Sequence, residues 1–477
     1  MIPSTDYIRL LPELILIVFG LLVMLIEPLL GEHNNRKGLG AIALMGAVLS
    51  ILASFYQTGY EGAAFFDMIH VDTFSIFFHV LIGLIAAVVI LASFEYLNLQ
   101  QIRYGEYYGL ILLSSVGMML MSSAVELVLI FIALEISSIG TYILAGFRRN
   151  APISIESSMK YFLLGSFATA FFLYGVALMF GATGSTSVYT IATTLAQGAT
   201  PLAYVGIALM FVGLGFKVAS APFHIWTPDV YEGAPAPVVA FMSTGPKAAA
   251  FAVLLRVLFA TEAPGWFWLI WASAVLSMTL GNIGALVQNN VKRLLAYSSI
   301  AQAGYILVAF AAAKDIGISA VIFYAAAYAA MNVGAFAVAS HLANVGEKYV
   351  TLDDYAGLGR RAPGLAAVLT IFMLSLIGIP VTGGFLAKFY VFQAAMQSHL
   401  TGLVIIGVIN SAVAAYYYLR VIVYMYMREP QRDVPVLKMP FALGVSLAAC
   451  LAATIYLGVL PGRILDYAMA SARVLVR

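Results

Sequence analysis

Apolar runs long enough to cross a bilayer recur along almost the whole 477-residue chain, separated by short polar breaks. A membrane-spanning helix needs about 20 mostly apolar residues. These runs predict an all-α polytopic membrane protein with about fourteen transmembrane helices. They cover residues 8–30, 39–57, 72–94, 107–122, 125–146, 157–180, 202–220, 236–260, 266–288, 294–312, 316–341, 363–396, 400–427 and 439–460.

Composition excludes several other classes of protein. Charged residues make up 10% of the chain, whereas soluble domains carry about 25%. The net charge of +2 offers no field of one sign for a nucleic acid. Cys450 is the single cysteine, so this chain can form no internal disulfide and no zinc or iron–sulfur cluster built from cysteines. No connection is long enough for a soluble domain, and residues 1–477 are therefore expected to form a single membrane domain.

The lysine and arginine residues of the short loops predict the orientation, because cytoplasmic loops are enriched in them. If the runs alternate in direction, thirteen loop residues lie on one side of the membrane: Arg36, Lys37, Arg103, Arg148, Arg149, Lys292, Arg293, Lys348, Arg360, Arg361, Arg428, Arg432 and Lys438. The other side receives only Arg9, Arg256, Lys314, Arg463, Arg473 and Arg477. The first side is predicted to be cytoplasmic, with both termini periplasmic. The segment 221–235 falls on the cytoplasmic side in this scheme, although it contains no Lys or Arg.

Two of the runs contain residues that break helices. The seventh run is followed by Pro222, and the twelfth contains Pro380, Gly383 and Gly384. Irregular backbone inside a membrane persists only where it is buried in protein or lines a wet cavity. Two interrupted helices five runs apart are typical of transporters built from inverted repeats. The predicted division is spans one to three (8–94), a first repeat (107–260), a second repeat (266–427), and the last span with its tail (439–477).

Four ionisable residues lie well inside the runs: Glu135, Lys217, Lys247 and Lys388. Each costs at least about 2.5–3.5 kcal/mol at mid-bilayer on insertion scales. Because desolvation disfavours the ammonium form, a lysine so placed can hold or release a proton near neutral pH. Four such residues on four helices are a costly way to stabilise a bundle, and they favour a proton relay over purely structural ion pairs.

Other polar residues near the runs have more ordinary interpretations. Lys160 and Arg420 lie within reach of span ends and are expected to extend toward the interface. His79 is expected to be a structural histidine. His224 would share a helical face with Lys217 if the helix continued past Pro222, which leaves open a relay role or a hydrogen bond that fixes the loop. Asp229 and Glu232 could collect protons at a cytoplasmic mouth or serve as caps and turns.

The stretch 217–247 reads KVASAPFHIWTPDVYEGAPAPVVAFMSTGPK. It resembles the signature of the antiporter-like membrane subunits of respiratory complex I. The sequence WTPDVYEGAP (226–235) resembles that of one of the sister subunits in particular. The other sister subunits and the multi-subunit sodium/proton antiporters generally have the sequence Trp-Leu-Pro-Asp-Ala at this position. MKYFLLGSF (159–167), KRLLAYSSIAQAGY (292–305) and TGGFLAKFYVF (382–392) also match the family. The resemblance extends through nearly the whole chain.

The resemblance implies a function and a set of residues. The family's buried glutamate falls on Glu135 and its three lysines on Lys217, Lys247 and Lys388, which in the family form a hydrophilic axis for proton translocation. It implies no cofactor in this chain. The implied partners are other membrane-arm subunits and, through them, the peripheral arm that oxidises NADH, all in a bacterial inner membrane. Two rival functions remain: a cation/proton antiporter subunit without redox coupling, and a structural scaffold.

Overall fold

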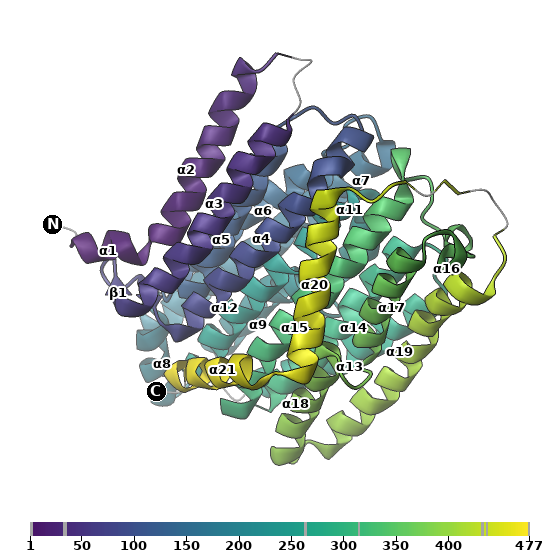
Figure 1. The fold of residues 1–477 in the computed structure, drawn as a ribbon. Coiled ribbons are helices and arrows are strands. Elements are labelled where there is room, and N and C mark those ends of the chain that lie inside the picture. The colour runs from purple at the N-terminus through teal and green to yellow at the C-terminus, as the bar shows by residue number, and fades with distance from the viewer. Residues whose placement is uncertain are drawn as a thin grey trace.

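Long helices occupy the apolar runs, and most of them lie side by side with similar direction in a thick slab (Figure 1). The computed structural model describes residues 3–31, 36–261, 265–312, 315–430, 434–435 and 437–475. The helices before the first predicted repeat are α1 (Ser4–Arg9), α2 (Leu11–Ile26), α3 (Lys37–Tyr56) and α4 (Thr73–Leu99). The short 3-10 turns are η1 (Glu27–Leu29), η2 (Gln57–Gly59), η3 (Val345–Glu347) and η4 (Leu352–Tyr355).

The middle of the chain supplies the inner helices. The predicted first repeat contains α5 (Glu106–Ser123), α6 (Leu127–Ala145), α7 (Pro152–Thr183), α8 (Val188–Ala196), α9 (Pro201–Val218), α10 (Trp226–Gly233), α11 (Ala236–Met242) and α12 (Gly245–Thr261). The second contains α13 (Gly265–Leu286), α14 (Val291–Ala311), α15 (Asp315–Ala343), α16 (Leu358–Arg361), α17 (Pro363–Ile377), α18 (Gly383–Gln397) and α19 (Thr401–Met427). Helices α20 (Phe441–Val459) and α21 (Gly462–Leu475) end the chain.

The expected all-α membrane architecture is confirmed, whereas the count of spans is not settled. Within the described residues, twelve helices are long and apolar enough to cross a membrane, and each falls on a predicted run. The two predicted runs outside this set are 107–122, which forms the serine-containing α5, and 363–396, which forms the two 15-residue helices α17 and α18. The count of fourteen and the inverted repeats therefore remain predictions.

Both predicted helix interruptions are confirmed. Helix α9 ends at Val218 because Ala219 adopts a left-handed conformation with φ of 57°, and the next helix begins only at Trp226. Helix α17 ends at Ile377, where Gly378 has φ of 94°, and α18 begins at Gly383. A left-handed residue is the usual way for a helix to stop, and glycine adopts it without steric cost.

The segment predicted to be a cytoplasmic loop has a different structure. Residues 226–233 form α10, which continues beyond the break and packs against α7 and α14. Trp226, Val230 and Tyr231 are buried in it. Because α10 is the second half of an interrupted helix, its lack of Lys and Arg follows from burial.

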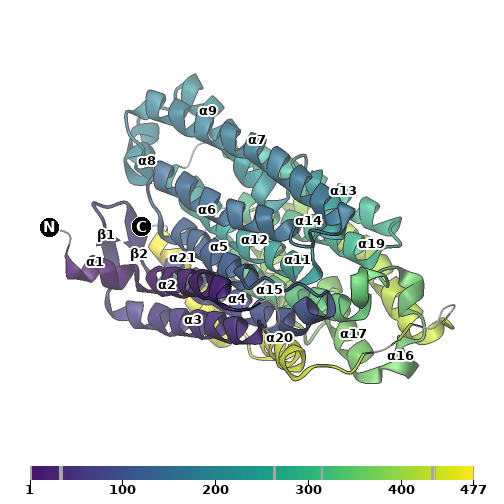
Figure 2. The ribbon, with the colours of Figure 1, turned by 90° about the horizontal axis from the view of Figure 1, so that it is seen from above.

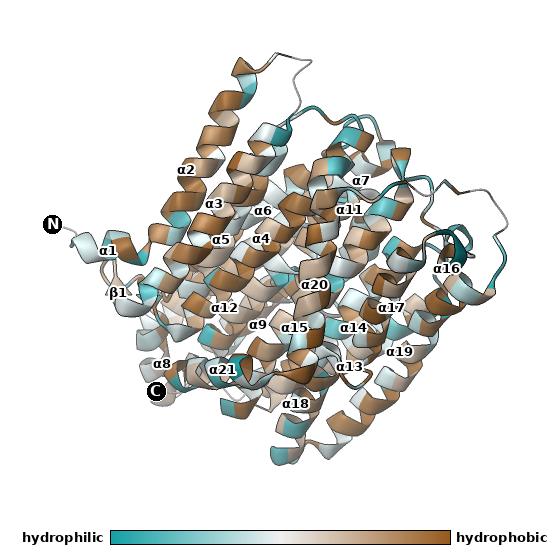
Figure 3. Cartoon of the chain, in the orientation of Figure 1, coloured by the Kyte–Doolittle hydropathy of each residue, from teal (hydrophilic) through white to brown (hydrophobic). Residues whose placement is uncertain are grey.

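The helices that carry polar residues of interest lie at the centre of the slab. Seen from above, α12, α14 and α15 are surrounded by the other helices (Figure 2). The spans Ala236–Val257, Val291–Ala311 and Asp315–Ala343 are the most buried of those identified. Hydrophobic residues dominate the long helices, and hydrophilic ones gather toward their ends and in the connections (Figure 3). A polar group on these central helices is therefore shielded from lipid.

Several small elements were not expected from the apolar runs. Strands β1 (Gly62–Ala64) and β2 (Ile69–Val71) form an antiparallel hairpin that pairs Ala63 with His70. Helix α8 is short, and α21 crosses the ends of the longer helices and packs on α4 and α15 (Figure 1). Both helices are too short to span a membrane. The eighth run is divided by a turn at Ser243 and Thr244 into α11 and α12.

The two termini lie near the same face of the slab (Figure 1), as an even number of spans requires. Arg9 donates to the carbonyls of Tyr60, Glu61 and Ala63, so the N-terminal segment contacts the connection after α3. Arg256, counted among the loop residues of that side, is instead 4% exposed inside a span. Lys314, Arg432 and Arg477, which also entered the orientation argument, lie outside the described residues.

Candidate functional site

Lys217 lies in the last turn of α9, directly before the break, and is 5% exposed. Its ammonium stands over the rings of Tyr142 and Tyr161, at 5.0 and 5.4 Å from their centroids. Glu135 interacts with it electrostatically, although no carboxylate of the described residues lies within the 4.0 Å of an ion pair. The pair predicted from sequence is thus near but not in direct contact.

Tyr142 lies on the same helix as Glu135 and packs against Lys217. Its hydroxyl is buried and has no hydrogen-bond partner among the described residues. One carboxylate oxygen of Glu135 is likewise buried without a hydrogen-bond partner. Gly165 of α7 makes room for the tyrosine, since a Cβ there would lie 2.1 Å from the hydroxyl oxygen. Buried polar atoms normally find partners, protein or water. Glu135 and Tyr142 lie seven residues apart on α6, so the two unpaired oxygens belong to the same face of that helix.

Lys247 lies on α12 and is 2% exposed. Its ammonium donates to the carbonyl of Ser299 at 3.0 Å and to the hydroxyl of the same residue, which also accepts from Tyr328 at 2.8 Å. A cavity of about 10 Å³ adjoins these groups, which is close to the smallest space that holds one water. Lys247 therefore has a carbonyl and a hydroxyl as partners, and no carboxylate of the described residues forms an ion pair with it.

Lys388 lies on α18 and folds back onto the end of α17. Its ammonium donates to the carbonyls of Leu376 and Ile377 at 3.1 and 2.8 Å and to the Ser411 hydroxyl at 2.9 Å. The carbonyls of a last helical turn have no partner within their own helix, and they carry the negative end of the helix dipole. The break thus creates the acceptors that hold the lysine.

Gln302 of α14 connects the surroundings of Lys247 and Lys388. Its amide nitrogen donates to the carbonyl of Leu376 at 3.1 Å, the same oxygen that accepts from Lys388, and to the Tyr418 hydroxyl at 3.2 Å. Its amide oxygen accepts from Tyr324. Because Gln302 lies one helical turn beyond Ser299, α14 supplies the hydrogen-bond acceptors of Lys247 and shares the Leu376 acceptor with Lys388.

Sequence reasoning missed the hydroxyl and amide groups of α14. Ser298, Ser299 and Gln302 interrupt the apolar run 294–312 with the spacing of one helical face. Ser298 pairs with the Tyr418 hydroxyl of α19. This spacing could have identified them, because a polar stripe within a span faces the bundle interior.

Tyr231 of α10 lies between the first and second lysine sites. Its buried hydroxyl has no hydrogen-bond partner among the described residues. It interacts electrostatically with Tyr161, which faces Lys217, and with Tyr328, which faces the partner of Lys247. The indole of Trp226 stacks on Tyr161, with ring centroids 4.5 Å apart, and donates to the carbonyl of Phe216. Trp226 and Tyr231 of the signature stretch thus extend the aromatic cluster that begins at Lys217.

His224 does not share a helical face with Lys217, because the helix ends six residues before it. It is partly buried in the connection between α9 and α10, and its Nδ1 is buried without a hydrogen-bond partner among the described residues. No hydrogen bond joins its ring to Lys217 within the described residues. The condition for a shared face, a helix continuing past Pro222, is therefore not met, and the two roles left open for His224 both stay predictions.

Asp229 and Glu232 are both ion-paired at the end of α10. Asp229 accepts from Lys160 of α7 and from Arg293 of α14, each at 2.8 Å, and Glu232 accepts from Arg293 at 2.7 Å. Burial alone would raise the pKa of Asp229, but the hydrogen bonds from Lys160 and Arg293 outweigh it and hold the pKa below its usual value. A carboxylate kept ionised this way holds protons poorly. The contacts instead join α10 to α7 and α14.

Glu347, which sequence reasoning did not single out, is the centre of a second buried cluster. Its carboxylate accepts from Lys292 at 2.7 Å, from the Tyr96 hydroxyl at 2.6 Å and from the backbone of Ala236 at 3.0 Å, and it lies 3.2 Å from Arg148. The residue has φ of 52°, outside the range usual for glutamate. The cluster joins the starts of α11 and α14 to the end of α4.

Arg420 and His79 have structural partners. Arg420 donates to the carbonyls of Leu286 and Gln288 at the end of α13, so it caps a helix where an extension to the interface was expected. His79 is fully buried, with ring nitrogens facing Gln57 and the carbonyl of Met119, and with Glu13 at 3.4 Å. Within the part of the chain that the structure describes, no hydrogen bond or ion pair joins either side chain to Lys217, Lys247 or Lys388.

Comparison with known proteins identifies close relatives. The family described as "NADH:quinone oxidoreductase/Mrp antiporter, TM" matches residues 124–414. The chain is 68% identical to NADH-quinone oxidoreductase subunit N 2 of Koribacter versatilis, over 100% of this chain and 99% of the relative. It is 47% identical to subunit N 1 of Solibacter usitatus, over 98% of this chain and 97% of the relative.

Solved structures agree in fold. A chain of the respiratory complex I structure from Thermus thermophilus with bound aureothin is 37% identical and superposes with a TM-score of 0.83, covering 95% of this chain and 98% of that one. A chain of the Mrp complex from Dietzia is 19% identical with a TM-score of 0.86, covering 99% of this chain and 97% of that one. The second likeness concerns the fold alone.

Proposed function

The chain belongs to the family of NADH:quinone oxidoreductase and Mrp antiporter membrane subunits, and from this premise we propose that it is subunit N of a NADH:quinone oxidoreductase. In this role it moves protons across a bacterial inner membrane, with both termini on the periplasmic side. The redox cofactors belong to other subunits of the complex, and this chain binds none.

One observation carries the proton-transfer proposal. Lys217, Lys247 and Lys388 are each buried beside hydroxyl, carbonyl or aromatic groups, and within the described residues none of the three has a carboxylate within 4.0 Å. A buried ammonium without a counter-ion is costly. Such a lysine gains by releasing its proton whenever a neighbouring acceptor becomes available. A permanent structural role would favour a close ion pair instead.

The proposed sequence of transfers begins at Glu135 and Lys217. Movement of Glu135 away from Lys217 destabilises the ammonium, and the proton passes by way of Tyr231 and bound water toward Lys247. From Lys247 it passes by way of bound water, oriented by the polar groups of Ser299 and Gln302, toward Lys388, which lies on the release side. Redox energy captured elsewhere in the complex shifts the position of Glu135.

The test removes the charge of Lys217 or of Glu135, one at a time, in the assembled complex. Lys217→Met and Glu135→Gln are expected to reduce NADH-driven proton uptake into inside-out membrane vesicles, with the coupled quinone reduction falling in parallel. Glu156→Gln is the matched control, since Glu156 lies on the exposed surface of α7, where its pair with Lys160 contributes at most about 1 kcal/mol. Assembly is checked by co-purification of the NADH-oxidising subunits.

The outcomes separate the rival functions. If Lys217→Met assembles normally and pumps at the wild-type rate, the relay is wrong and the scaffold role is supported. If the chain purifies without NADH:quinone oxidoreductase activity yet exchanges cations for protons, it is an antiporter subunit and the assignment to complex I is wrong.

A further inference from the structure

Two cavities follow one another along the crevice between α4, α15 and α20. The first has a volume of about 170 Å³ and is lined by Tyr96 of α4, Ala337 of α15 and Leu443 of α20, among others. The second has a volume of about 240 Å³ and is lined by the same three helices, through residues such as Ala330 and Ala453, and by Ile464 of α21. Ser446 donates to the carbonyl of Val88 at 3.1 Å and holds α20 against α4 between them.

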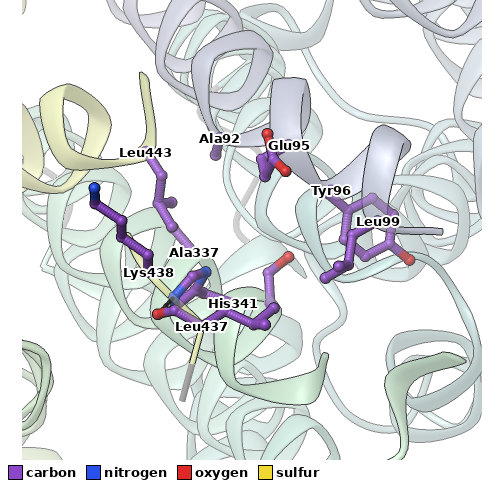
Figure 4. Close-up of a pocket in the computed structure, with 10 residues that line it drawn as sticks. Ala92, Glu95, Tyr96, Leu99, Ala337, His341, Leu437, Lys438 and Leu443 are labelled. Carbon is purple, nitrogen blue, oxygen red and sulfur yellow. Dashed lines mark hydrogen bonds between the residues drawn. The ribbon is translucent and has the colours of Figure 1, made fainter. Parts of the chain in front are cut away.

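The two cavities differ in chemistry. The second is lined almost wholly by aliphatic side chains, many of them alanines, and its rim includes Leu84, which is 48% exposed toward the bilayer. The first combines aliphatic side chains with Glu95, His341 and Lys438, which Figure 4 shows around the same space. The crevice is therefore amphipathic along its length, with a polar end and an apolar end.

The polar end has opposite charges on different elements. Lys438 precedes α20 and is exposed, with no ion pair among the described residues, and Glu95 comes from α4 (Figure 4). Lys37 lies 3.7 Å from Glu95, with side chains 50% and 42% exposed. A pair so solvated contributes little, which leaves the carboxylate available to a second cation. The Nε2 atom of His341 is hydrogen-bonded to the carbonyl oxygen of Leu437, at 3.2 Å.

The spacing of the cavities fits one leaflet of a bilayer. Tyr96 and Ile85 line the first and second cavity on α4, and eleven helical residues correspond to about 16 Å. Half of the hydrocarbon core is about 15 Å thick. The polar end lies beside the connections that hold Arg103, Lys348 and Arg428, on the side predicted to be cytoplasmic. Its charges are thus at headgroup level when the apolar cavity is near the bilayer centre.

We propose that this crevice binds one glycerophospholipid whose headgroup carries an ammonium group, as in phosphatidylethanolamine. The phosphate is held by Lys438, the ammonium by Glu95, and one acyl chain lies in the second cavity. A phosphatidylglycerol would leave Glu95 with only its solvated pair to Lys37, and a quinone would in addition leave Lys438 without an anion to bind. The site is separate from the lysines of the proposed proton path and does not depend on that function.

The test measures lipid retained by the purified complex. The complex is washed in detergent and supplied with phosphatidylethanolamine and phosphatidylglycerol in equal amounts, and the bound lipid is quantified by mass spectrometry. The Lys438→Gln and Ala453→Leu variants are expected to retain one phosphatidylethanolamine per complex fewer than the wild type. The matched controls are Lys348→Gln, an exposed lysine on the same side, and Ala452→Leu, the neighbouring α20 residue outside the cavity.

Glu95→Gln tests the choice of headgroup. It is expected to lower the preference for phosphatidylethanolamine over phosphatidylglycerol about two- to fivefold, as suits a partly exposed charge pair. Equal retention by the wild type and the Lys438→Gln and Ala453→Leu variants would overturn the site. Recovery of a quinone in place of the lipid, or an unchanged preference in Glu95→Gln, would overturn the proposed ligand.

Discussion

The ammonium of Lys388 donates to the carbonyl of Ile377, the last residue of α17, at 2.8 Å. A continuous helix would use that oxygen for its own backbone hydrogen bond four residues further on. The break at Gly378 leaves it free, and the lysine one turn into α18 takes it. Lys217 has the complementary position, in the last turn before the other break. In both interrupted helices, the irregular backbone and the buried charge therefore occur together.

Lys388 is expected to act through its charge. Lys388→Met should lower proton uptake and remove one donor from each of the carbonyls of Leu376 and Ile377, which keep Gln302 and Ser411 as donors. The loss of one hydrogen bond at a carbonyl that keeps another donor costs about 0.5–1.5 kcal/mol. Lys388→Arg restores a cation and is expected to recover assembly more fully than activity, because guanidinium does not release its proton. Equal pumping by wild type and Lys388→Met would exclude Lys388 from the path.

The packing of Tyr142 against Lys217 can be disturbed from the neighbouring helix. Gly165→Ala would bring a Cβ to 2.1 Å from the Tyr142 hydroxyl, so the ring must move off the lysine. We expect lower proton uptake with normal assembly. Gly181→Ala on the same helix is the control, since its Cβ would meet Leu202 at an ordinary 3.5 Å. Indistinguishable rates in the two variants would show that the position of Tyr142 does not matter.

The break in the twelfth run is expected to be sensitive to small changes in volume. A Cβ at Gly384 would lie 1.9 Å from the carbonyl oxygen of Ser375, and backbone cannot yield as a flexible side chain can. Gly384→Ala should destabilise the chain by about 1–3 kcal/mol or more, seen as a lower thermal midpoint of the purified complex. Gly364→Ala in α17 has open space around it and should leave the midpoint unchanged. A normal midpoint for Gly384→Ala would mean that the ends of α17 and α18 are not closely packed.

The apolar runs from 8–30 to 439–460 could be assigned to helices from the sequence, because the length of an apolar run is the dominant signal in a membrane protein. Pro222, Pro380 and the glycines predicted the two breaks for a local reason, the loss of a backbone donor and the gain of conformational freedom. The partners of the lysines were harder to find. Ser299 and Leu376 meet Lys247 and Lys388 only through tertiary packing, and a backbone carbonyl has no signature in a sequence.

The clusters at Glu347 and Arg256 were missed for a related reason. Charged residues beside short loops were assigned to the aqueous phase, which is the basis of the orientation argument. Arg256 instead pairs with Asp72 at 2.8 Å, and Lys292 with Glu347 at 2.7 Å, each buried. A charged side chain near the end of a span can point into the protein when an oppositely charged residue from a distant segment pairs with it. The neighbouring sequence does not indicate which residue that partner is.

Glu347 is expected to give the chain a pH-dependent stability. Burial alone would raise its pKa, but Lys292, Arg148 and Tyr96 outweigh this and hold the pKa below the usual 4.5. Because the folded-state pKa is the lower one, the ionised carboxylate stabilises the fold fully above about pH 4.5, and this contribution is lost as pH falls further. The thermal midpoint of wild type should exceed that of Glu347→Gln by a constant amount near neutral pH, and by less toward pH 4. Asp353→Asn, an exposed carboxylate in the same region, is the control; a difference that stays constant down to pH 4 would contradict the assignment.

Gln302 provides the sharpest test of the link between the second and third lysine. Its amide donates to Leu376, which also accepts from Lys388, and it lies one turn from Ser299, which accepts from Lys247. Gln302→Leu keeps nearly the same volume but removes both donors and the acceptor, so it should lower proton uptake while Lys247 and Lys388 keep their other partners. Gln288→Leu is the control, because the side-chain amide of Gln288 donates to the carbonyl of Gly284, within its own helix region, and has no other hydrogen bond among the described residues. The readout is the rate of NADH-driven proton uptake by the assembled complex. A reduced rate in Gln302→Leu alone supports transfer along α14, whereas a wild-type rate would require a route between the lysines that bypasses this helix.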